Sequence, residues 1–329
     1  MSIFFQERIL ITGGTGSWGR TLTRLLLKNY SVKEIVIYSR GELQQVLMQR
    51  DFDFDPRIKF VIGDVRDSDA LTRACAGIDL IFHLAALKHV PICEDHPQEA
   101  IKTNITGTTN VINAAIINQV KKVIDVSTDK AVEPLNLYGM TKSVGERLML
   151  QANDLTDHTK FICVRGGNVM GSNGSVIPFF INEIQKGGPV RLTDRRMTRF
   201  FLTLEQAIHL LFRATDVGIG RETFVMNMPS CSIQDLLAVL MEHYGQVPIQ
   251  EIGAKPGEKI HEVLISRHES ALSRQLDHDY YVILPQINNR SMLDVYDKLP
   301  NIAHDEFTSN TQLMNKSQIY QMLRQGKFL

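Results

Sequence analysis

One segment near the N-terminus restricts the fold of this chain more than any other. The apolar run RILIT at residues 8–12 leads directly into GGTGSWG at residues 13–19, and an amphipathic stretch follows. Glycine allows a tight turn and lets backbone N–H groups approach a pyrophosphate at a helix N-terminus. These glycines could form a plain structural turn, but their place between a strand and a helix predicts a dinucleotide site. The expected cofactor contacts in this turn are Gly13, Thr15, Gly16, Ser17, Trp18 and Gly19.

Short apolar runs alternate with helical stretches through the first half of the chain. This alternation is typical of α/β proteins in which helices cover both faces of a doubly wound parallel sheet. We therefore expect a Rossmann domain over residues 1–167. The predicted strands are residues 8–12, 34–38, 59–62, 80–84, 123–127 and 161–165.

The regular alternation ends near Asn168, where glycine and proline become frequent. We expect residues 168–329 to form a smaller, mixed C-terminal substrate lobe with an irregular tail. Residues 204–228 are an exception, because a helical stretch and an apolar run there predict one more helix and strand that rejoin the first domain. At 329 residues the chain is long enough for this two-part organisation.

The end of the second predicted strand indicates which dinucleotide binds. An acidic residue there would hydrogen-bond a free ribose 2′-hydroxyl, but the chain has Ser39 and Arg40, which suit a 2′-phosphate. The sequence therefore favours NADP over NAD, although Arg40 could instead be a solvated surface residue. Further cofactor contacts are expected after the third and fourth strands, at Asp64, Val65, Ala85 and Ala86.

A tyrosine and a lysine follow the fifth predicted strand. Tyr138 and Lys142 are four residues apart, so a helix would carry both on one face. A phenol with a pKa of about 10 is a poor base, but a neighbouring ammonium and a nicotinamide cation favour the phenolate. Tyr138 could then take a proton from a sugar hydroxyl as hydride leaves, while Lys142 also holds the nicotinamide ribose. Such pairs arise by chance, but this one follows a strand in a chain with a dinucleotide turn.

The fifth predicted strand itself ends in Ser127, Thr128, Asp129 and Lys130, where an open α/β sheet presents groups to its ligand. Simple alcohol oxidation or epimerisation would need only a hydroxyl here, so an acid beside an amine indicates further proton transfers. Asp129 could protonate a departing hydroxyl, and Lys130 could remove a carbon-bound proton made acidic by an adjacent ketone. The alternative is a surface ion pair at the end of a strand.

With these motifs the sequence resembles the extended short-chain dehydrogenase/reductases. More narrowly it resembles the inverting UDP-N-acetylglucosamine 4,6-dehydratases, which begin pseudaminic-acid-type sugar pathways. The likeness runs nearly end to end, and STDKA, NLYGMTK and MTRFF are specific to this group. Related dehydratases acting on dTDP-glucose or GDP-mannose typically carry Glu in place of Lys130, and some close relatives carry Met in place of Tyr138. The chain departs from the usual pattern at Gly166, Asn173 and Lys255.

The resemblance implies oxidation at carbon 4, elimination of water across carbons 5 and 6, and return of hydride to carbon 6. Thr128 would assist Tyr138, NADP would end each cycle as it began, and the enzyme would be a homo-oligomer. The implied cofactor contacts are Lys88, Thr103, Lys142 and Val169. The implied contacts to the UDP-sugar are Lys88, Asn168, Val176, Ile177, Pro178, Phe179, Arg199, Lys255 and Glu258.

Three alternatives stay open at this point. A UDP-sugar epimerase would use the oxidising pair but would release no water. A truncated dehydratase would release the 5,6-unsaturated 4-keto sugar without returning the hydride, and the same acid and base would serve it. A protein that only senses NADP would keep the dinucleotide turn without the chemistry.

Composition argues against other classes of function. Lys plus Arg equals Asp plus Glu at 36 each, so no global field draws nucleic acid or a membrane surface. The 4 cysteines lack metal-like spacing and are expected to be buried, reduced thiols, so no metal site is predicted. The N-terminus lacks the pattern of a signal peptide, and no apolar run reaches about 20 residues. We expect a cytoplasmic protein whose partner is a UDP-sugar.

Overall fold

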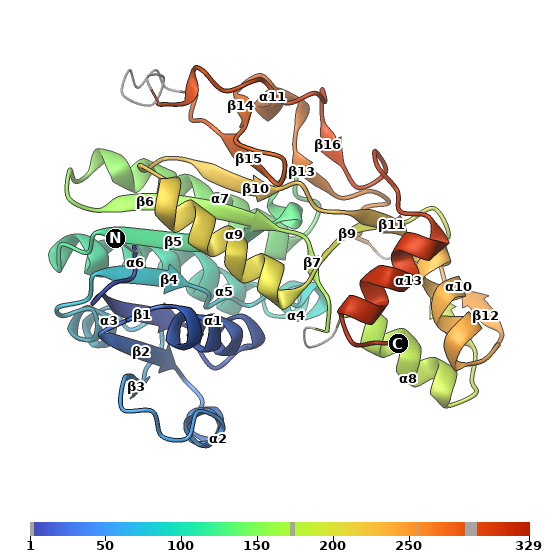
Figure 1. Ribbon diagram of the computed structural model, residues 1–329, viewed down its shortest axis with the longest axis horizontal. Coiled ribbons are helices and arrows are strands. Elements are labelled where there is room, and N and C mark those ends of the chain that lie inside the picture. Colours follow the sequence, from blue (N-terminus) through green and yellow to red (C-terminus); the bar gives the residue numbers. More distant parts are fainter. Residues whose placement is uncertain (1–2, 172–174, 255, 287–294) are drawn as a thin grey trace.

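The computed structural model describes residues 3–171, 175–254, 256–286 and 295–329 and is built around one large sheet (Figure 1). Within these residues the strand order is β14-β15-β10-β6-β5-β4-β1-β2-β3. Neighbouring strands from β10 to β3 in this order are parallel, whereas β15 and β14 continue the sheet antiparallel. The strands are β1 (Arg8–Thr12), β2 (Glu34–Ser39), β3 (Ile58–Ile62), β4 (Leu80–His83), β5 (Lys122–Thr128), β6 (Lys160–Gly166), β10 (Thr223–Met226), β14 (Ser273–Gln275) and β15 (Tyr280–Ile283).

Helices cover both faces of this sheet because its strands are apolar on both sides. In β1, Ile9 and Ile11 pack with α1 and α9, whereas Leu10 packs with α3, α6 and α7. The strand order reverses between β1 and β4, which is where open α/β sheets bind their ligands. The helices around the sheet are α1 (Ser17–Asn29), α2 (Glu42–Asp51), α3 (Ser68–Ala74), α4 (Val90–Asp95), α5 (Pro97–Ile101), α6 (Gly107–Ile117), α7 (Leu137–Gln151) and α9 (Leu204–Val217).

The structure confirms the predicted fold class, a doubly wound parallel sheet of Rossmann type. All six predicted strands are present, and no end differs by more than one residue from its prediction. The sheet also includes β10, which follows α9 and pairs with β6 in parallel. Residues 204–228 thus add a helix and a strand beside the first six strands. The domain boundary at residue 167 stays a prediction.

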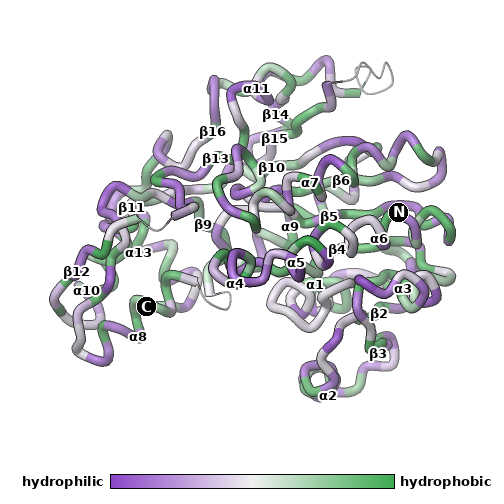
Figure 2. Tube along the Cα trace, turned by 180° about the vertical axis from the view of Figure 1, so that it is seen from behind, coloured by the Kyte–Doolittle hydropathy of each residue, from purple (hydrophilic) through white to green (hydrophobic). Residues whose placement is uncertain are grey.

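Most of the remaining elements form a lobe at one end of the sheet (Figure 1), and Figure 2 shows the same lobe from behind. Its apolar core joins α8, α10 and α13 to β8 and β9. No helix within the described ranges is long and apolar enough to cross a membrane. Outside this lobe, β13 (Val263–Ile265), α11 (Arg267–Ser270) and β16 (Phe307–Thr308) lie near β14 and β15 (Figure 1). The other elements are β7 (Asn168–Val169), α8 (Val176–Gln185), β8 (Val190–Leu192), β9 (Thr198–Leu202), β11 (Ser230–Ser232), α10 (Ile233–Tyr244), β12 (Ile249–Glu251) and α13 (Lys316–Gln325).

Candidate active site

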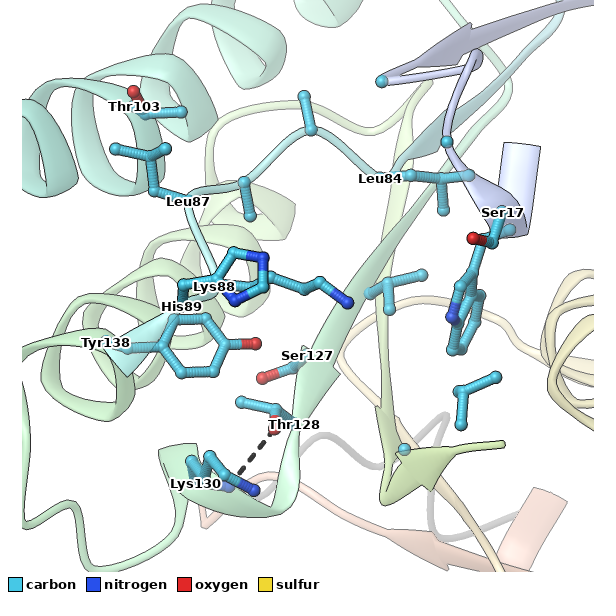
Figure 3. Close-up of a pocket in the computed structure, with 18 of the residues that line it drawn as sticks. Ser17, Leu84, Leu87, Lys88, His89, Thr103, Ser127, Thr128, Lys130 and Tyr138 are labelled. Atoms are coloured by element: carbon cyan, nitrogen blue, oxygen red, sulfur yellow. Dashed lines mark hydrogen bonds between the residues drawn. The ribbon is translucent and has the colours of Figure 1, made fainter. Parts of the chain in front are cut away.

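A pocket of about 960 Å³ lies at the carboxyl ends of β1, β4, β5 and β6. Its walls come from the glycine turn, the loop after β4, the end of β5, the start of α7 and residues 257–262. Segments that are far apart in the sequence therefore meet in one cavity (Figure 3). The predicted site residues that line it are Gly13, Thr15, Gly16, Ser17, Trp18, Ser39, Arg40, Asp64, Val65, Ala85, Ala86, Lys88, Thr103, Thr128, Lys130, Tyr138, Asn168, Val169, Val176, Arg199 and Glu258.

The glycine turn brings β1 and the loop after β4 close together. Gly13 has a φ of +64°, and a Cβ there would lie 2.9 Å from backbone atoms of Ala85. Any L side chain would be disfavoured on both counts. The N-terminal turn of α1 lines the pocket, so its backbone N–H groups can receive a phosphate. Gly19 does not line the pocket, and it serves packing instead, because a Cβ there would lie 2.2 Å from the carbonyl oxygen of Gly14.

The end of β2 presents one buried and one exposed polar side chain. The Oγ of Ser39 is buried and accepts a hydrogen bond from Gln45 Nε2 at 3.0 Å. The Arg40 side chain is 58% exposed, and its Nη1 lies 3.9 Å from Asp64 Oδ2. Asp64 is held more tightly by Arg66, whose Nη2 donates to Oδ2 at 2.6 Å. Arg40 can therefore turn toward an anionic group at this edge of the pocket with little loss of contact.

The loop after β4 is fixed by a buried amide. Asn104 accepts a hydrogen bond from the Leu87 N–H at 2.8 Å and donates one to the Leu87 carbonyl at 2.9 Å. Lys88 follows directly and extends into the pocket (Figure 3), where burial lowers the pKa of its amine. Thr103 lies on the π-helical turn at Lys102–Thr106 and has a buried hydroxyl without a partner among the described residues. Because buried polar atoms need partners, this hydroxyl fits a polar ligand such as a nicotinamide dinucleotide.

The start of α7 brings Tyr138 to the end of β5. Asn136 caps the helix by accepting a hydrogen bond from the Gly139 N–H at 2.8 Å. Gly139 allows a close approach of α7 to the 3₁₀ turn at Asp129–Ala131, directly after β5, because a Cβ there would lie 2.1 Å from the carbonyl oxygen of Lys130. The phenol of Tyr138 points into the pocket near Thr128 (Figure 3). Burial raises the pKa of Tyr138, and the ammonium groups of Lys142 and Lys130 oppose that shift.

Lys142 lies behind the pocket wall and is 2% exposed. Its Nζ is 3.4 Å from each carboxylate oxygen of Asp125, which is fully buried in β5. Burial disfavours the ammonium, but the neighbouring groups, Asp125 foremost, together outweigh burial and raise the pKa of Lys142. Lys142 is therefore held as a cation on the same helix as Tyr138. A bound nicotinamide ribose would have to reach it past the lining residues.

Lys130 contacts two buried carboxylates. Its Nζ lies 3.0 Å from Asp129 Oδ1 and 3.2 Å from Glu262 Oε1. Burial disfavours the ammonium, but the two carboxylates outweigh it and raise the pKa of Lys130. Burial also raises the pKa of Asp129, despite Lys130 and a hydrogen bond that Thr128 Oγ1 donates at 3.0 Å. The ion pair considered as an alternative is present, but it is buried beside the pocket and is not a surface feature.

Some of the predicted sugar contacts line the pocket, and others do not. Arg199 lines the pocket, but its guanidinium already donates to the carbonyls of Thr198, Lys259 and Ile260 at 2.7–3.0 Å. It therefore fixes the 257–262 segment. The predicted contacts that do not line the pocket are Ile177, which is fully buried in the apolar core of the lobe, and Pro178 and Phe179, which are exposed. The prediction at Lys255 lies outside the described residues.

Sequence reasoning assigned no role to several polar groups of the site. The hydroxyls of Ser127 and Ser175 line the pocket, are buried, and have no partner among the described residues. Asp125 had a visible signal, because it is a charged residue between the apolar residues Ile124 and Val126 in the middle of a strand. Glu262 had no local signal, because only the fold brings it to Lys130.

Both the strand order and a pocket at the carboxyl ends of the strands are those of a dinucleotide-binding enzyme of the short-chain dehydrogenase type. The chain belongs to the family described as polysaccharide biosynthesis protein, whose pattern matches residues 9–284. It is 44% identical over 288 residues to a UDP-N-acetylglucosamine 4,6-dehydratase (inverting) of Campylobacter jejuni, which covers 87% of this chain and 85% of the relative. It is also 39% identical to a UDP-glucose 4-epimerase of Rickettsia bellii, over 98% of this chain and 96% of the relative.

Solved structures agree with this assignment. Pen from Bacillus thuringiensis has a TM-score of 0.92 and 38% identity, and the match covers 99% of both chains. A dTDP-glucose 4,6-dehydratase of Streptomyces venezuelae, solved with NAD, has a TM-score of 0.71 at 23% identity over 77% of this chain and 86% of that chain, which shows the fold alone. The resemblance inferred from the sequence is therefore confirmed: the protein is an enzyme of the nucleotide-sugar dehydratase and epimerase kind.

Proposed function

We propose that this enzyme is an NADP-dependent UDP-N-acetylglucosamine 4,6-dehydratase. One observation carries the proposal: the Asp129–Lys130 acid–base pair adjoins the same pocket as Tyr138 and Thr128. An oxidising pair alone would serve a dehydrogenase or an epimerase. An additional buried carboxyl and amine supply the acid and the base that elimination of water requires. The similarity to a relative named for this reaction supports the same conclusion.

Each group then has a role that its surroundings support. Tyr138, with Thr128, takes the proton of the carbon-4 hydroxyl, and Lys142 lowers the energy of the phenolate. Lys130 removes the carbon-5 proton, which the adjacent ketone has made acidic, and Asp129 protonates the carbon-6 hydroxyl so that water leaves. A bound nicotinamide dinucleotide supplies the hydride acceptor at carbon 4 and the hydride donor at carbon 6.

Arg40 and Ser39 support NADP as the dinucleotide. No carboxylate follows β2 at the place where a ribose 2′-hydroxyl would be bound, and an exposed guanidinium lies there instead. The nearby Asp64 is engaged by Arg66, so it leaves Arg40 available to a 2′-phosphate. Purified protein should retain NADP(H), which can be identified by mass after denaturation.

A 4-epimerase is the second candidate, because the chain matches Rickettsia relatives with that name over nearly its whole length. An epimerase would use Tyr138 and the dinucleotide but would leave the elimination groups idle. The two candidates differ in the mass of the product, since epimerisation gives an isomer and dehydration removes water.

Incubation of the purified enzyme with UDP-N-acetylglucosamine, without added reductant, tests the proposal. We expect a product about 18 mass units lighter, the mass of the water that elimination removes. NMR of the product formed in deuterated water reports the configuration at carbon 5 and distinguishes the saturated 4-keto sugar from the 5,6-ene. A product of unchanged mass would contradict the dehydratase function and support the epimerase function.

We also propose that the enzyme is a cytoplasmic homo-oligomer. Its four cysteines are buried and free, which is typical of proteins from reducing compartments. Apolar side chains are exposed on α4, α5 and α7, which contact one another, and a subunit interface would cover them: Ile92, Ile101, Met140 and Val144. Light scattering coupled to size-exclusion chromatography should give a multiple of the chain mass.

A further inference from the structure

The acid–base chemistry proposed above requires a group that accepts a proton from Lys130. Lys130 can act as a base only as a neutral amine, yet the two carboxylates that contact it favour its ammonium form. Asp129 cannot serve as the destination of that proton if it must already carry one for the departing hydroxyl. A second acceptor in contact with Lys130 is therefore needed.

Glu262 meets this need by its geometry. Its Oε1 lies 3.2 Å from Lys130 Nζ, it lines the pocket, and it is 2% exposed. Its Oε2 is buried and has no partner among the described residues, so this oxygen can take up a proton without breaking a hydrogen bond. Its backbone is held on both sides by Ser309, whose Oγ accepts from the Glu262 N–H at 2.9 Å and whose N–H donates to the Glu262 carbonyl at 2.8 Å.

We propose that Glu262 is a positioning residue that accepts the proton Lys130 must lose, so that Lys130 becomes a base while Asp129 remains an acid. This inference rests on the dehydratase function proposed above. The surroundings shift the pKa values of the two carboxyl groups, Asp129 and Glu262, in opposite directions. Burial raises the pKa of Asp129, and Glu262 adds to that effect, whereas burial of Glu262 is outweighed by its cationic neighbours, which lower its pKa. Glu262 is therefore the ionised carboxyl group, as an acceptor must be, while the raised pKa of Lys130 makes the transfer uphill and the neutral amine a minor species. The charged groups that face Glu262 are Lys130, Arg199, Lys259 and Asp129.

The protons balance over one cycle. One N–H bond of Lys130 breaks as an O–H bond forms on Glu262. The free amine takes the carbon-5 proton, and Asp129 gives its proton to the carbon-6 hydroxyl, which leaves as water. When carbon 5 is reprotonated by Lys130, Glu262 returns its proton to the amine. Asp129 regains the proton that Tyr138 took from the carbon-4 hydroxyl, through Thr128, whose Oγ1 donates to Asp129 Oδ1 at 3.0 Å.

Glu262→Gln tests the proposal, because glutamine keeps the shape and the hydrogen bond to Lys130 but cannot take a proton. In single turnovers with UDP-N-acetylglucosamine we expect reduced nicotinamide to accumulate at 340 nm, since carbon 4 is still oxidised. Loss of water should slow by about 10²-fold or more, the usual contribution of a proton-transfer group. The residual rate should rise with pH, because Lys130 must then release its proton to solvent. Glu262→Asp, which restores a carboxyl group, should recover part of the rate.

Three results would overturn the proposal: wild-type dehydration in Glu262→Gln, equal losses in the Gln and Asp variants, or a parallel loss of carbon-4 oxidation. A measurement in the absence of sugar distinguishes failure of the proposal about Glu262 from failure of the proposed dehydratase function. Infrared spectra of the wild-type holoenzyme at neutral pH should contain the band of a protonated carboxyl group that Asp129→Asn removes. Glu262→Gln should shift the titration of that band to lower pH. A band that does not respond to Glu262→Gln contradicts the proposal, even if the wild-type enzyme proves to be an epimerase.

Discussion

Two neighbouring strands of the sheet each end at a cation between two carboxylates, and the two clusters differ in how completely they are paired. At the end of β6, Arg165 donates to both oxygens of Glu146 and both oxygens of Glu269, at 2.7–3.0 Å. Directly after β5, Lys130 contacts one oxygen of Asp129 and one of Glu262, and the other oxygen of each carboxylate is buried with no partner in the part of the chain that the structure describes.

This difference separates a structural cluster from a reactive one. A guanidinium cannot be deprotonated in proteins and fits two carboxylates in a fixed geometry, so Arg165 ties β6 to α7 and α11. An amine can lose its proton, and unpaired oxygens can receive one, so the Lys130 cluster can change its protonation state. The segment from Glu262 to Glu269, which includes β13, supplies one carboxylate to each cluster and is thereby linked to both strand ends.

The largest expected effect on stability comes from removing the structural cation. Arg165→Met leaves the buried carboxylate of Glu146 and the partly buried carboxylate of Glu269 without their partner, and it should lower the free energy of unfolding by about 3–5 kcal/mol. Urea denaturation followed by circular dichroism measures this change. Lys59→Met is the matched control, because Lys59 is 62% exposed in its pair with Glu34 and should cost at most about 1 kcal/mol. If the two variants lost equal stability, the structural role of the Arg165 cluster would be refuted.

A third buried group, His83, extends the comparison, because within the described ranges its imidazole ring is hydrogen-bonded to hydroxyl groups and not to a charged group. Its ring nitrogens lie 2.7 Å from Thr12 Oγ1 and 3.2 Å from Thr108 Oγ1, and burial lowers its pKa to about 4. The unfolded chain binds a proton on this histidine near pH 6.5, but the folded protein does so only near pH 4. Stability from His83 is therefore complete above pH 6.5 and declines as the pH falls toward 4, by about 3 kcal/mol.

His83→Gln tests this prediction, because glutamine does not titrate in that range. Thermal unfolding between pH 7 and pH 4 should show a smaller decline for the variant than for the wild type. Parallel curves for the two proteins would mean that His83 titrates normally in the folded state.

The smallest effect is expected at the exposed end of the pocket. Arg40 is 58% exposed, so Arg40→Ala should leave stability unchanged. It should reduce the preference for NADP over NAD by about tenfold, the lower range for a charge-assisted hydrogen bond in a screened position. Competition binding of the two dinucleotides to cofactor-free enzyme measures the ratio. An unchanged ratio would assign the 2′-phosphate contact to another group.

Local sequence patterns predicted most of the fold and those parts of the site that lie close together in the sequence. The glycine turn and the six strands are encoded by contiguous residues, so spacing and alternation were sufficient to place them. Tyr138 and Lys142 were likewise predictable, because a helix sets their relation. Glu262 and Lys130 are brought together by the packing of β13 near the turn after β5, and no sequence period encodes that contact.

At Ile177 the family resemblance and the local helix pattern lead to different predictions. The family resemblance placed it at the sugar, but its side chain is fully buried with Phe180 and Ile184 in the core of the lobe. The spacing of these three residues on α8 is that of the buried face of an amphipathic helix, so the pattern was visible in the sequence.

Two sets of groups, Tyr138 with Thr128 and Asp129 with Lys130, are proposed to act on one sugar ring, and Lys130→Ala tests this most directly. A single turnover with UDP-N-acetylglucosamine should reduce the bound nicotinamide at 340 nm, while the product lighter by the mass of water forms about 10²–10⁴-fold more slowly than in the wild type. Tyr138→Phe should instead prevent reduction of the nicotinamide. Full dehydration by Lys130→Ala would contradict the account, because the buried amine would then have no part in removing the carbon-5 proton.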